Sequence, residues 1–570
     1  MNGITSTLKR SKSELKQLTK EPLVIIAIVV SFLLFFIFII YPIGSAVIYS
    51  LKAMGENGIQ EENFSLKVYE FIFTHKRFFN AISNSLVLGI IVASTCTVMG
   101  FIFAFAMARI KLPLQGVFKN IALLPIISPP FMFAISVILL FGRSGLITFR
   151  LLGIDRFEIY GLPGLIIVQT ISMFPIAFMT LMGVLQAIDP DLETCAMNLG
   201  ARRFKSFRSV TLPLALPGIF AAWLLTFVAS ITDFGNPIII GGDFNVLSVL
   251  AYLEFTGMGN LPRGCALAIV LLVPTVCVFF LQKYIMRKNT YATITGKSTR
   301  RATLKAKPYI KVVLFIFCSL LILIILMFYG TIIFTSFVNL WGIDWTPTLK
   351  WFEYAYTVGM ETFQDTVFLA SIATPITAIF GMIVAFLVVR KVFPGRHFLE
   401  LLTMMSYAIP GTAIGIGYIL AFNKPPLLLT GTAVILIACY IFRNIPIGVE
   451  AGVAALKQIS AEIEESSANL GANTAHTFRK ITLPLITPAF FAGATFSFVR
   501  CMTAISAIIF LVSGSWRHLT ILTLGQTEDM RLGAAGALST ILILVIIIAL
   551  FLIKKITGLG QEKIFGEIGH

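Results

Sequence analysis

The chain has 570 residues, of which 57% are hydrophobic and only 12% are charged. An ordinary soluble protein is roughly 25% charged, so this chain has too few charges to cover a water-facing surface. The composition excludes a soluble enzyme, a disordered regulator and a fibrous protein, and it predicts a polytopic helical membrane protein. The net charge of +17 indicates membrane orientation and not nucleic-acid binding, because basic residues collect in cytoplasmic loops.

Twelve stretches are apolar and long enough to cross about 30 Å of hydrocarbon as helices. The expected fold class is therefore all-α, with about twelve transmembrane helices. The stretches run approximately over 22–49, 82–108, 119–141, 162–187, 214–235, 264–286, 309–336, 365–389, 399–422, 429–456, 485–512 and 533–553.

Basic residues are distributed unevenly along this pattern. With a cytoplasmic N-terminus, the inner segments hold 30 of the 44 Lys and Arg residues, the outer segments hold 12, and two fall within spans. This bias predicts that both termini are cytoplasmic. The expected domains are a basic tail (1–21), a first six-span unit (22–286), a basic linker facing anionic lipid (287–308), a second six-span unit (309–556) and a C-terminal tail (557–570).

The two halves repeat each other in sequence. Residues 193–217 read ETCAMNLGARRFKSFRSVTLPLALP and residues 464–488 read EESSANLGANTAHTFRKITLPLITP, with a constant offset of 271. Farther upstream the offset becomes 281, as between Gly100 and Gly381. The duplication is therefore parallel, with six spans of the same orientation in each half.

Each repeated block is polar and lies on the expected cytoplasmic side. The segment Asp191–Leu199 favours a short helix whose acidic first turn complements the helix dipole, and Gly200 allows a sharp turn after it. Phe204 and Phe207 then follow at helical spacing among basic residues. This pattern predicts a short helix on the membrane face, exposed to a partner, and the alternative is a helix that only lies on lipid.

The repeated block resembles the EAA loop of ATP-binding-cassette importer permeases. That loop has a Glu, a Gly seven residues later, and a hydrophobic residue two positions before Leu-Pro. Both copies here depart from the Glu-Ala-Ala triplet of the family. The matching residues are Glu193, Gly200, Val210 and Leu212-Pro213 in the first half, and Glu464, Gly471, Ile481 and Leu483-Pro484 in the second.

The resemblance implies partners and coupling residues. Each loop, 189–213 and 460–484, would form a coupling helix that docks on a cytoplasmic ATPase subunit, so two such subunits are expected. An extracytoplasmic substrate-binding protein and a place in the bacterial cytoplasmic (inner) membrane are implied as well. The coupling residues by this resemblance are Glu193, Gly200, Ala201, Phe204, Phe207, Arg208 and Pro213, with Glu464, Gly471, Ala472, Phe478, Arg479 and Pro484.

The chain itself is not expected to be an enzyme or to bind a cofactor. Its nearest approach to a phosphate-binding loop is Gly296-Lys297-Ser298, but Tyr291 stands at the position of the first glycine. ATP and magnesium are therefore assigned to the partner ATPase subunits. The histidines are far apart in sequence, so no metal site is expected.

A secondary, ion-coupled transporter is the alternative from a different class, because twelve spans in two halves also describe the major facilitator family. Such a transporter needs no pair of matched docking helices. Coupling-ion carboxylates inside the spans are also nearly absent. The repeated blocks therefore favour the ATP-driven importer.

The segment Asp233-Phe234-Gly235-Asn236-Pro237, with Gly241-Gly242 after it, resembles the fused permeases of the iron(III) import family. This resemblance implies iron(III) as the substrate. Related permeases carry thiamine, aminophosphonate or sugar phosphate, and these remain alternatives.

Three charged residues lie inside or at the end of spans, where a charge costs roughly 2.5–3.5 kcal/mol on insertion scales. Asp233 is near the outer end of the fifth span, and Arg443 and Arg500 are expected at mid-membrane in the tenth and eleventh. They either line a polar translocation path or form buried ion pairs with one another. A path lined by arginines favours an anionic or chelated cargo over a bare Fe³⁺ ion.

Proline and glycine interrupt two spans at corresponding places. Pro129-Pro130 falls in the third span, and Pro410-Gly411 falls in the ninth. Broken helices are common around transport sites, although kinks filled by packing explain the pattern equally well.

Overall fold

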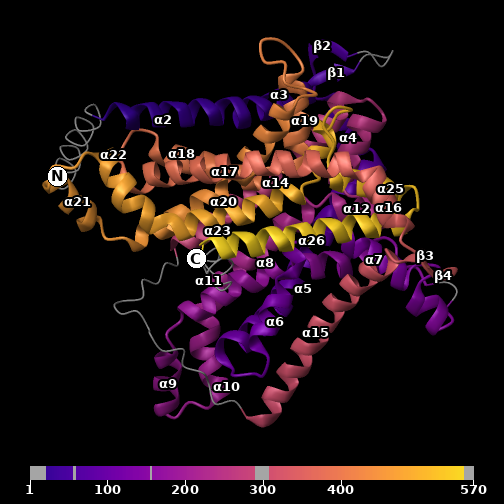
Figure 1. Cartoon of the computed structure of the whole chain (residues 1–570), viewed down its shortest axis with the longest axis horizontal. Coiled ribbons are helices and arrows are strands. Elements are labelled where there is room, and N and C mark those ends of the chain that lie inside the picture. The colour runs from indigo at the N-terminus through magenta and orange to yellow at the C-terminus, as the bar shows by residue number, and fades with distance from the viewer. Residues whose placement is uncertain (1–20, 55–59, 155–156, 289–306, 558–570) are drawn as a thin grey trace.

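The computed structural model describes residues 21–54, 60–154, 157–288 and 307–557. In these ranges it is all-α apart from two short β-hairpins (Figure 1). Eleven of the described helices are long and apolar enough to cross a membrane, and a pair bent by 108° raises the number to as many as twelve. The expected all-α polytopic fold is confirmed.

The first half contains one hairpin and six spans or broken spans, in which the η elements are short 3₁₀ or π turns. Its elements are α2 (Pro22–Phe35), η1 (Phe36–Ile40), α3 (Tyr41–Ser50), β1 (Lys52–Met54), β2 (Gln60–Phe64), α4 (Lys67–Thr74), α5 (Lys76–Arg109), α6 (Gln115–Ala122), η2 (Leu124–Ile126), α7 (Met132–Phe141), η3 (Leu146–Leu151), α8 (Leu162–Ala187), α9 (Pro190–Asn198), α10 (Arg203–Ser206), η4 (Phe207–Thr211), α11 (Leu212–Ile231), α12 (Gly235–Ile240), α13 (Leu247–Tyr252), η5 (Leu253–Gly257) and α14 (Leu261–Lys288).

The second half repeats this order, again with an antiparallel hairpin after its first span. Its elements are α15 (Pro308–Thr335), β3 (Val338–Leu340), β4 (Asp344–Pro347), α16 (Lys350–Thr357), α17 (Gly359–Arg390), α18 (Arg396–Ala408), α19 (Gly411–Phe422), α20 (Ala433–Gln458), α21 (Ala461–Asn469), α22 (Thr474–Thr477), η6 (Phe478–Thr482), α23 (Leu483–Met502), α24 (Ile508–Leu511), α25 (Leu519–Glu528) and α26 (Leu532–Thr557).

Two expected spans are broken where proline interrupts them. Stretch 119–141 forms α6, η2 and α7, and Pro129-Pro130 lies between η2 and α7. Stretch 399–422 forms α18 and α19, which meet at Pro410 with a bend of 108°. Proline removes a backbone donor and disfavours a helical residue before it, which explains why the helices end there.

Equivalent hydrogen bonds occur at corresponding positions of the two halves. The backbone N–H of Leu247 donates to Ser85 Oγ over 2.8 Å, and that of Leu519 donates to Thr366 Oγ1 over the same distance. Ser85 and Thr366 are related by the offset of 281 seen in the sequence. The duplicated sequence has therefore produced a duplicated structure.

The halves are interlaced, because the first span of each packs on the other. In one direction, the rings of Phe133 on α7 and Phe328 on α15 lie 6.0 Å apart, and Ser136 Oγ donates to Phe328 O over 2.9 Å. In the other, a Cβ added at Gly417 on α19 would lie 2.6 Å from Pro42 O on α3. Glycine therefore allows α3 and α19 to approach closely.

The opening helix α2 also lies along the second half, beside α17 and α18 (Figure 1). The ring of Phe35 lies 5.8 Å from that of Phe380, and the η1 residue Phe38 stacks on Phe442 at 4.9 Å. The sequence halves are thus not two separate bodies.

Candidate functional site

The first repeated segment, residues 189–213, forms a short helix, a turn and a second short helix. Asp189 caps α9 by accepting a hydrogen bond from the N–H of Asp191 over 2.9 Å. The helix ends at Asn198, which confirms the prediction for Asp191–Leu199 to within a residue. Gly200 has φ +87°, a left-handed conformation that glycine adopts without strain.

The second repeated segment, residues 460–484, has the same construction in α21, α22 and η6. Gly471 has φ +85°. The rings of Phe386 and Phe478 meet edge to face at 5.0 Å, and those of Phe105 and Phe207 meet in the same way at 5.5 Å in the first half. One ring of each segment therefore packs on the end of the long helix α5 or α17.

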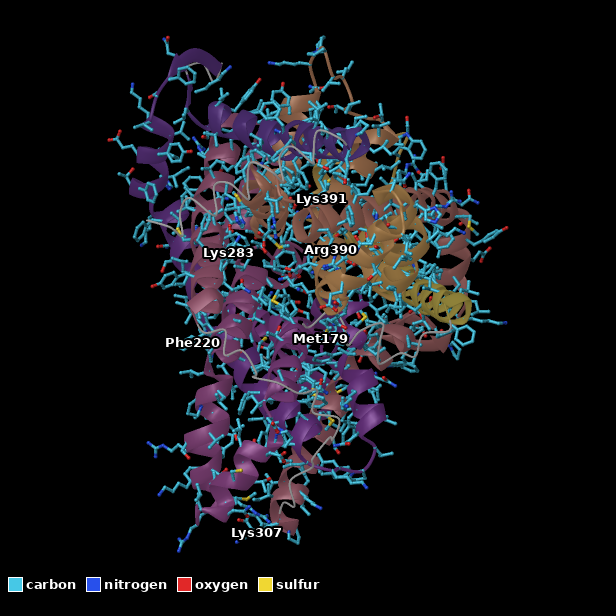
Figure 2. All side chains as sticks on the ribbon, turned by 90° about the vertical axis from the view of Figure 1, so that its left-hand side faces the viewer. Met179, Phe220, Lys283, Lys307, Arg390 and Lys391 are labelled. Atoms are coloured by element: carbon cyan, nitrogen blue, oxygen red, sulfur yellow. The ribbon has the colours of Figure 1, made fainter. Side chains whose placement is uncertain are left out.

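Both segments lie on the side of the molecule away from the hairpins: the second is at the left of Figure 1, near the start of α2, and the first is at the lower left, near the start of α15. The hairpins β1–β2 and β3–β4 lie toward the right of the figure. Basic side chains are spread across the view from the left-hand side (Figure 2): Lys283, Lys307, Arg390 and Lys391.

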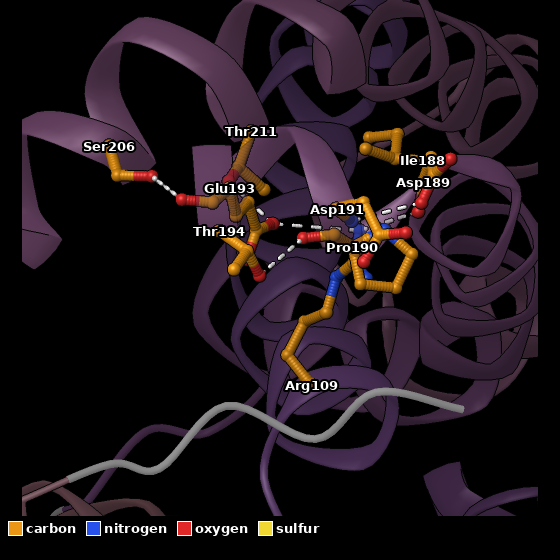
Figure 3. A network of polar contacts seen from close by, with 9 residues as sticks. All are labelled: Arg109, Ile188, Asp189, Pro190, Asp191, Glu193, Thr194, Ser206 and Thr211. Carbon is orange, nitrogen blue, oxygen red and sulfur yellow. Dashed lines mark hydrogen bonds and ion pairs between the residues drawn. The ribbon is translucent and has the colours of Figure 1, made fainter. Parts of the chain in front are cut away.

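Glu193 does not face the surface. It is 2% exposed, its carboxylate accepts from Thr211 Oγ1 over 2.8 Å, and it lies 3.5 Å from the guanidinium of Arg109 at the end of α5. Arg109 also donates to the carbonyl of Ile188 over 2.9 Å (Figure 3). The prediction of a short helix exposed to a partner is wrong at this residue, which instead joins α9 to α5 and η4.

Part of this arrangement recurs in the second half. Arg390, which corresponds to Arg109, donates to the carbonyls of Ile459 over 2.9 Å and Leu456 over 3.0 Å. The side chain of Glu464 lies outside the described part of the structure. The end of α17 is therefore tied to the start of its segment as α5 is.

The other predicted residues of the segments lie at or near the surface. Phe204 is 74% exposed, and the half-buried residues are Ala201, Phe207, Ala472 and Phe478. The remaining exposed residues are Gly200, Arg208, Pro213, Gly471, Arg479 and Pro484.

Two leucines at the tips of the segments were not among the predicted coupling residues. Leu199 and Leu470 are each 89% exposed, and each directly precedes the turn glycine. The sequence feature that could have predicted them is that the same leucine occurs at the equivalent position of both copies of the repeat. A large apolar side chain exposed at the same place in two copies indicates a contact with another protein.

Asp233 lies between α11 and α12, in the first half. Its Oδ2 accepts from Gln169 Nε2 over 2.9 Å and from Asn236 Nδ2 over 2.8 Å. Its carboxylate is thus satisfied by two amides and forms no ion pair with Arg443 or Arg500. The interpretation of these three residues as mutual ion pairs is wrong.

Arg443 and Arg500 lie in the second half, on α20 and α23. Arg443 is half-buried, and its Nη1 is buried without a hydrogen-bond partner. Arg500 is exposed, with its guanidinium 5.5 Å from the ring centre of Phe496. Both positive charges lie within membrane spans, where a charge is costly.

Glu450 was not among the predicted residues of the translocation path. It is exposed on α20, seven residues after Arg443, and so lies on the same face of that helix. The sequence feature that could have predicted it is a carboxylate within the apolar stretch 429–456. Within the described residues, no three His, Cys, Asp or Glu side chains come together as metal ligands.

A family described as the binding-protein-dependent transport system inner membrane component matches residues 85–291 and 377–556. The chain belongs to this family. It is a multi-pass permease of the inner membrane with two permease domains fused in one chain, and its family is that of the transport subunits of ATP-binding-cassette importers.

Similar proteins include two with ferric transport in their names. The ferric transport system permease protein FbpB of Actinobacillus pleuropneumoniae is 34% identical over 96% of this chain and 80% of its own length. The putative ferric transport system permease protein FbpB 1 of Haemophilus influenzae is 34% identical over 90% of this chain and 82% of its own. The sulfate transport system permease protein CysT of Salmonella typhimurium is 24% identical over 38% of this chain and 85% of its own.

Proposed function

We propose that this chain forms the membrane path of an iron(III) importer and is driven by two cytoplasmic ATPase subunits, one docked on each repeated segment. The observation that carries the proposal is the pair of segments on the side of the molecule away from the hairpins. Each segment has one leucine, Leu199 or Leu470, that is 89% exposed. ATP and magnesium then belong to the ATPase subunits, and both termini of this chain are cytoplasmic.

The anchoring of the first segment explains how force from an ATPase would reach the spans. Arg109, Glu193 and Thr211 connect the segment to α5 and to the turn that leads into α11. A displacement of α9 would therefore move these long helices with it. Movement of the two segments relative to each other would rock the interlaced halves between outward-open and inward-open states.

Iron(III) is supported by the two similar proteins whose names specify ferric transport, since both resemble this chain over nearly its whole length. An extracytoplasmic binding protein would deliver the iron at the end opposite the segments. Thiamine, aminophosphonate and sugar phosphate are the competing cargoes within the same class.

Docking is tested by replacing the exposed leucines. The double variant Leu199→Asp and Leu470→Asp should retain its fold, because both side chains are in solvent, and should lose most copurifying ATPase. The matched control is Leu428→Asp, a leucine 62% exposed in the loop between α19 and α20. ATPase recovery that is equal for the double variant and the wild type would contradict the docking proposal.

The cargo is tested in the reconstituted complex by ATPase stimulation. Candidate binding proteins are loaded with Fe³⁺, thiamine, aminophosphonate or sugar phosphate, and only the iron-loaded protein should stimulate hydrolysis. Stimulation by the protein loaded with sugar phosphate and not by the iron-loaded protein would show that the cargo is a sugar phosphate. The proposal of an ATP-driven importer would still stand. Uptake that needs an ion gradient and no ATPase subunit would instead establish a secondary transporter.

A further inference from the structure

The bend between α18 and α19 leaves a helix start inside the protein. The two helices meet at 108°, and α19 begins at Gly411 after Pro410, which supplies no side-chain cap. The first N–H groups of a helix have no partner within it, and the helix dipole makes this end positive. The start of α19 therefore combines backbone N–H groups that have no side-chain cap with the positive end of the helix dipole.

One buried guanidinium nitrogen, Nη1 of the half-buried Arg443, lies at the same place. A Cβ added at Gly411 would overlap both Arg443 Nη1 and Ser506 Oγ, so these two atoms converge on the first residue of α19. Arg443 Nη1 and Thr412 Oγ1 are both buried without a hydrogen-bond partner. A buried donor left unpaired is costly, and here two such side-chain atoms lie beside an uncapped helix start.

Among the described residues, no ion pair with a carboxylate balances the charge at this place, since Glu450, on the same face of α20, lies about two helical turns from Arg443. Arg443 and Arg500 both lie within membrane spans, and neither forms an ion pair with a carboxylate in the described part of the chain. Asp233 is satisfied by Gln169 and Asn236. Two like charges within membrane spans are expensive unless a ligand compensates them.

The corresponding place in the first half is different. Pro130, Ser172 and Gly235 stand where the second half has Gly411, Arg443 and Ser506. A Cβ at Gly235 would lie 2.9 Å from Pro130 and 3.6 Å from Ile505. In the first half, the space beside Gly235 is therefore occupied by Pro130. Gly235 also lies close to Ile505, the residue before Ser506, where the two halves meet.

We propose that the start of α19, with Arg443 and Ser506, binds an oxyanion, either a phosphate or a carboxylate group, and that iron(III) passes this point together with that anion. The anion then supplies acceptors to Arg443 Nη1 and Thr412 Oγ1, which are buried without a hydrogen-bond partner, and to the uncapped N–H groups of the helix start. The identification of the anion as part of the cargo rests on the proposed function, whereas the anion site itself does not.

The test is equilibrium binding of labelled inorganic phosphate and of labelled citrate to the full chain in lipid nanodiscs. We expect saturable binding of at least one probe, weakened about tenfold or more in Arg443→Gln. Ser506→Ala should weaken binding less, and it keeps the test valid if Arg443→Gln fails to fold. The control Arg517→Gln changes an exposed arginine 3.7 Å from Glu361 and should bind as the wild type does.

Binding of phosphate alone or citrate alone identifies the anion and supports the site. If neither probe binds saturably, or if Arg443→Gln and Ser506→Ala both bind like the wild type, the site is overturned. Iron uptake by the complete reconstituted importer is measured in parallel. Anion binding without iron uptake would contradict the proposed cargo only, and iron uptake without anion binding would contradict this inference only.

Discussion

At the scale of single residues, the least expected position is that of Glu193. Removing its carboxylate in Glu193→Ala would leave the guanidinium of Arg109 buried without its charge partner. Breaking a buried pair in this way costs about 3 kcal/mol. We therefore expect a clearly lower thermal midpoint for the purified variant, together with loss of ATPase coupling, although Glu193 itself is not exposed to the partner.

The control for this prediction is the exposed pair Arg143–Glu158, whose side chains are 75% and 67% exposed at a distance of 3.0 Å. Exposed ion pairs contribute little, so Arg143→Ala should unfold like the wild type. Equal thermal midpoints for Glu193→Ala and the wild type would show that the buried contact does not hold the segment.

The sequence motif identified Glu193 but could not show that it is buried. Its partner Arg109 lies far upstream on another helix, and only the packing of α5 against the segment brings the two together. The exposed leucines Leu199 and Leu470 were likewise present in the repeat, yet their exposure depends on how each segment turns at its glycine.

At the scale of elements, the close contact between α3 and α19 depends on a missing side chain. Gly417→Ala would place a methyl group 2.6 Å from a backbone oxygen of α3, and overpacking of this kind costs about 1–3 kcal/mol. We expect a lower thermal midpoint and slower transport. Gly44→Ala on α3 is the matched control, since a Cβ there meets nothing within 4 Å, and a larger effect of Gly44→Ala would contradict this packing.

The elements themselves were predictable because each apolar stretch must satisfy its backbone in lipid as a helix. The breaks at Pro129-Pro130 and Pro410 followed from proline chemistry. The size of the bend at Pro410, 108°, could not be predicted from proline chemistry, because the packing of α19 against α3 and α24 sets it. The anion site depends on that bend and could not be derived from the sequence alone.

At the scale of the whole molecule, the interlacing predicts how the chain behaves when it is divided. A chain cut within residues 289–306 and expressed as two pieces should copurify as one complex, because α2 and α3 pack on the second half and α15 packs on the first. Removing residues 1–50 from the first piece should weaken this association strongly. Pieces that purify separately and remain folded would contradict the interlaced arrangement.

The duplication was visible in the sequence as a constant offset, but the exchange of first spans was not. Nothing in an apolar stretch such as 22–49 specifies which half it contacts. That choice arises from matched surfaces, such as Phe35 and Phe38 against Phe380 and Phe442, that the fold brings together.

Site-specific cross-linking tests the central claim most directly. Leu199→Cys and Leu470→Cys are introduced separately in a background in which the exposed Cys195 and Cys277 are replaced by serine, and a short thiol-reactive cross-linker is added to the complex. Both positions should cross-link to an ATPase subunit, and Leu428→Cys should not. Absence of cross-links from both segment positions, or equal cross-linking from Leu428→Cys, would contradict the docking of ATPase subunits on the repeated segments.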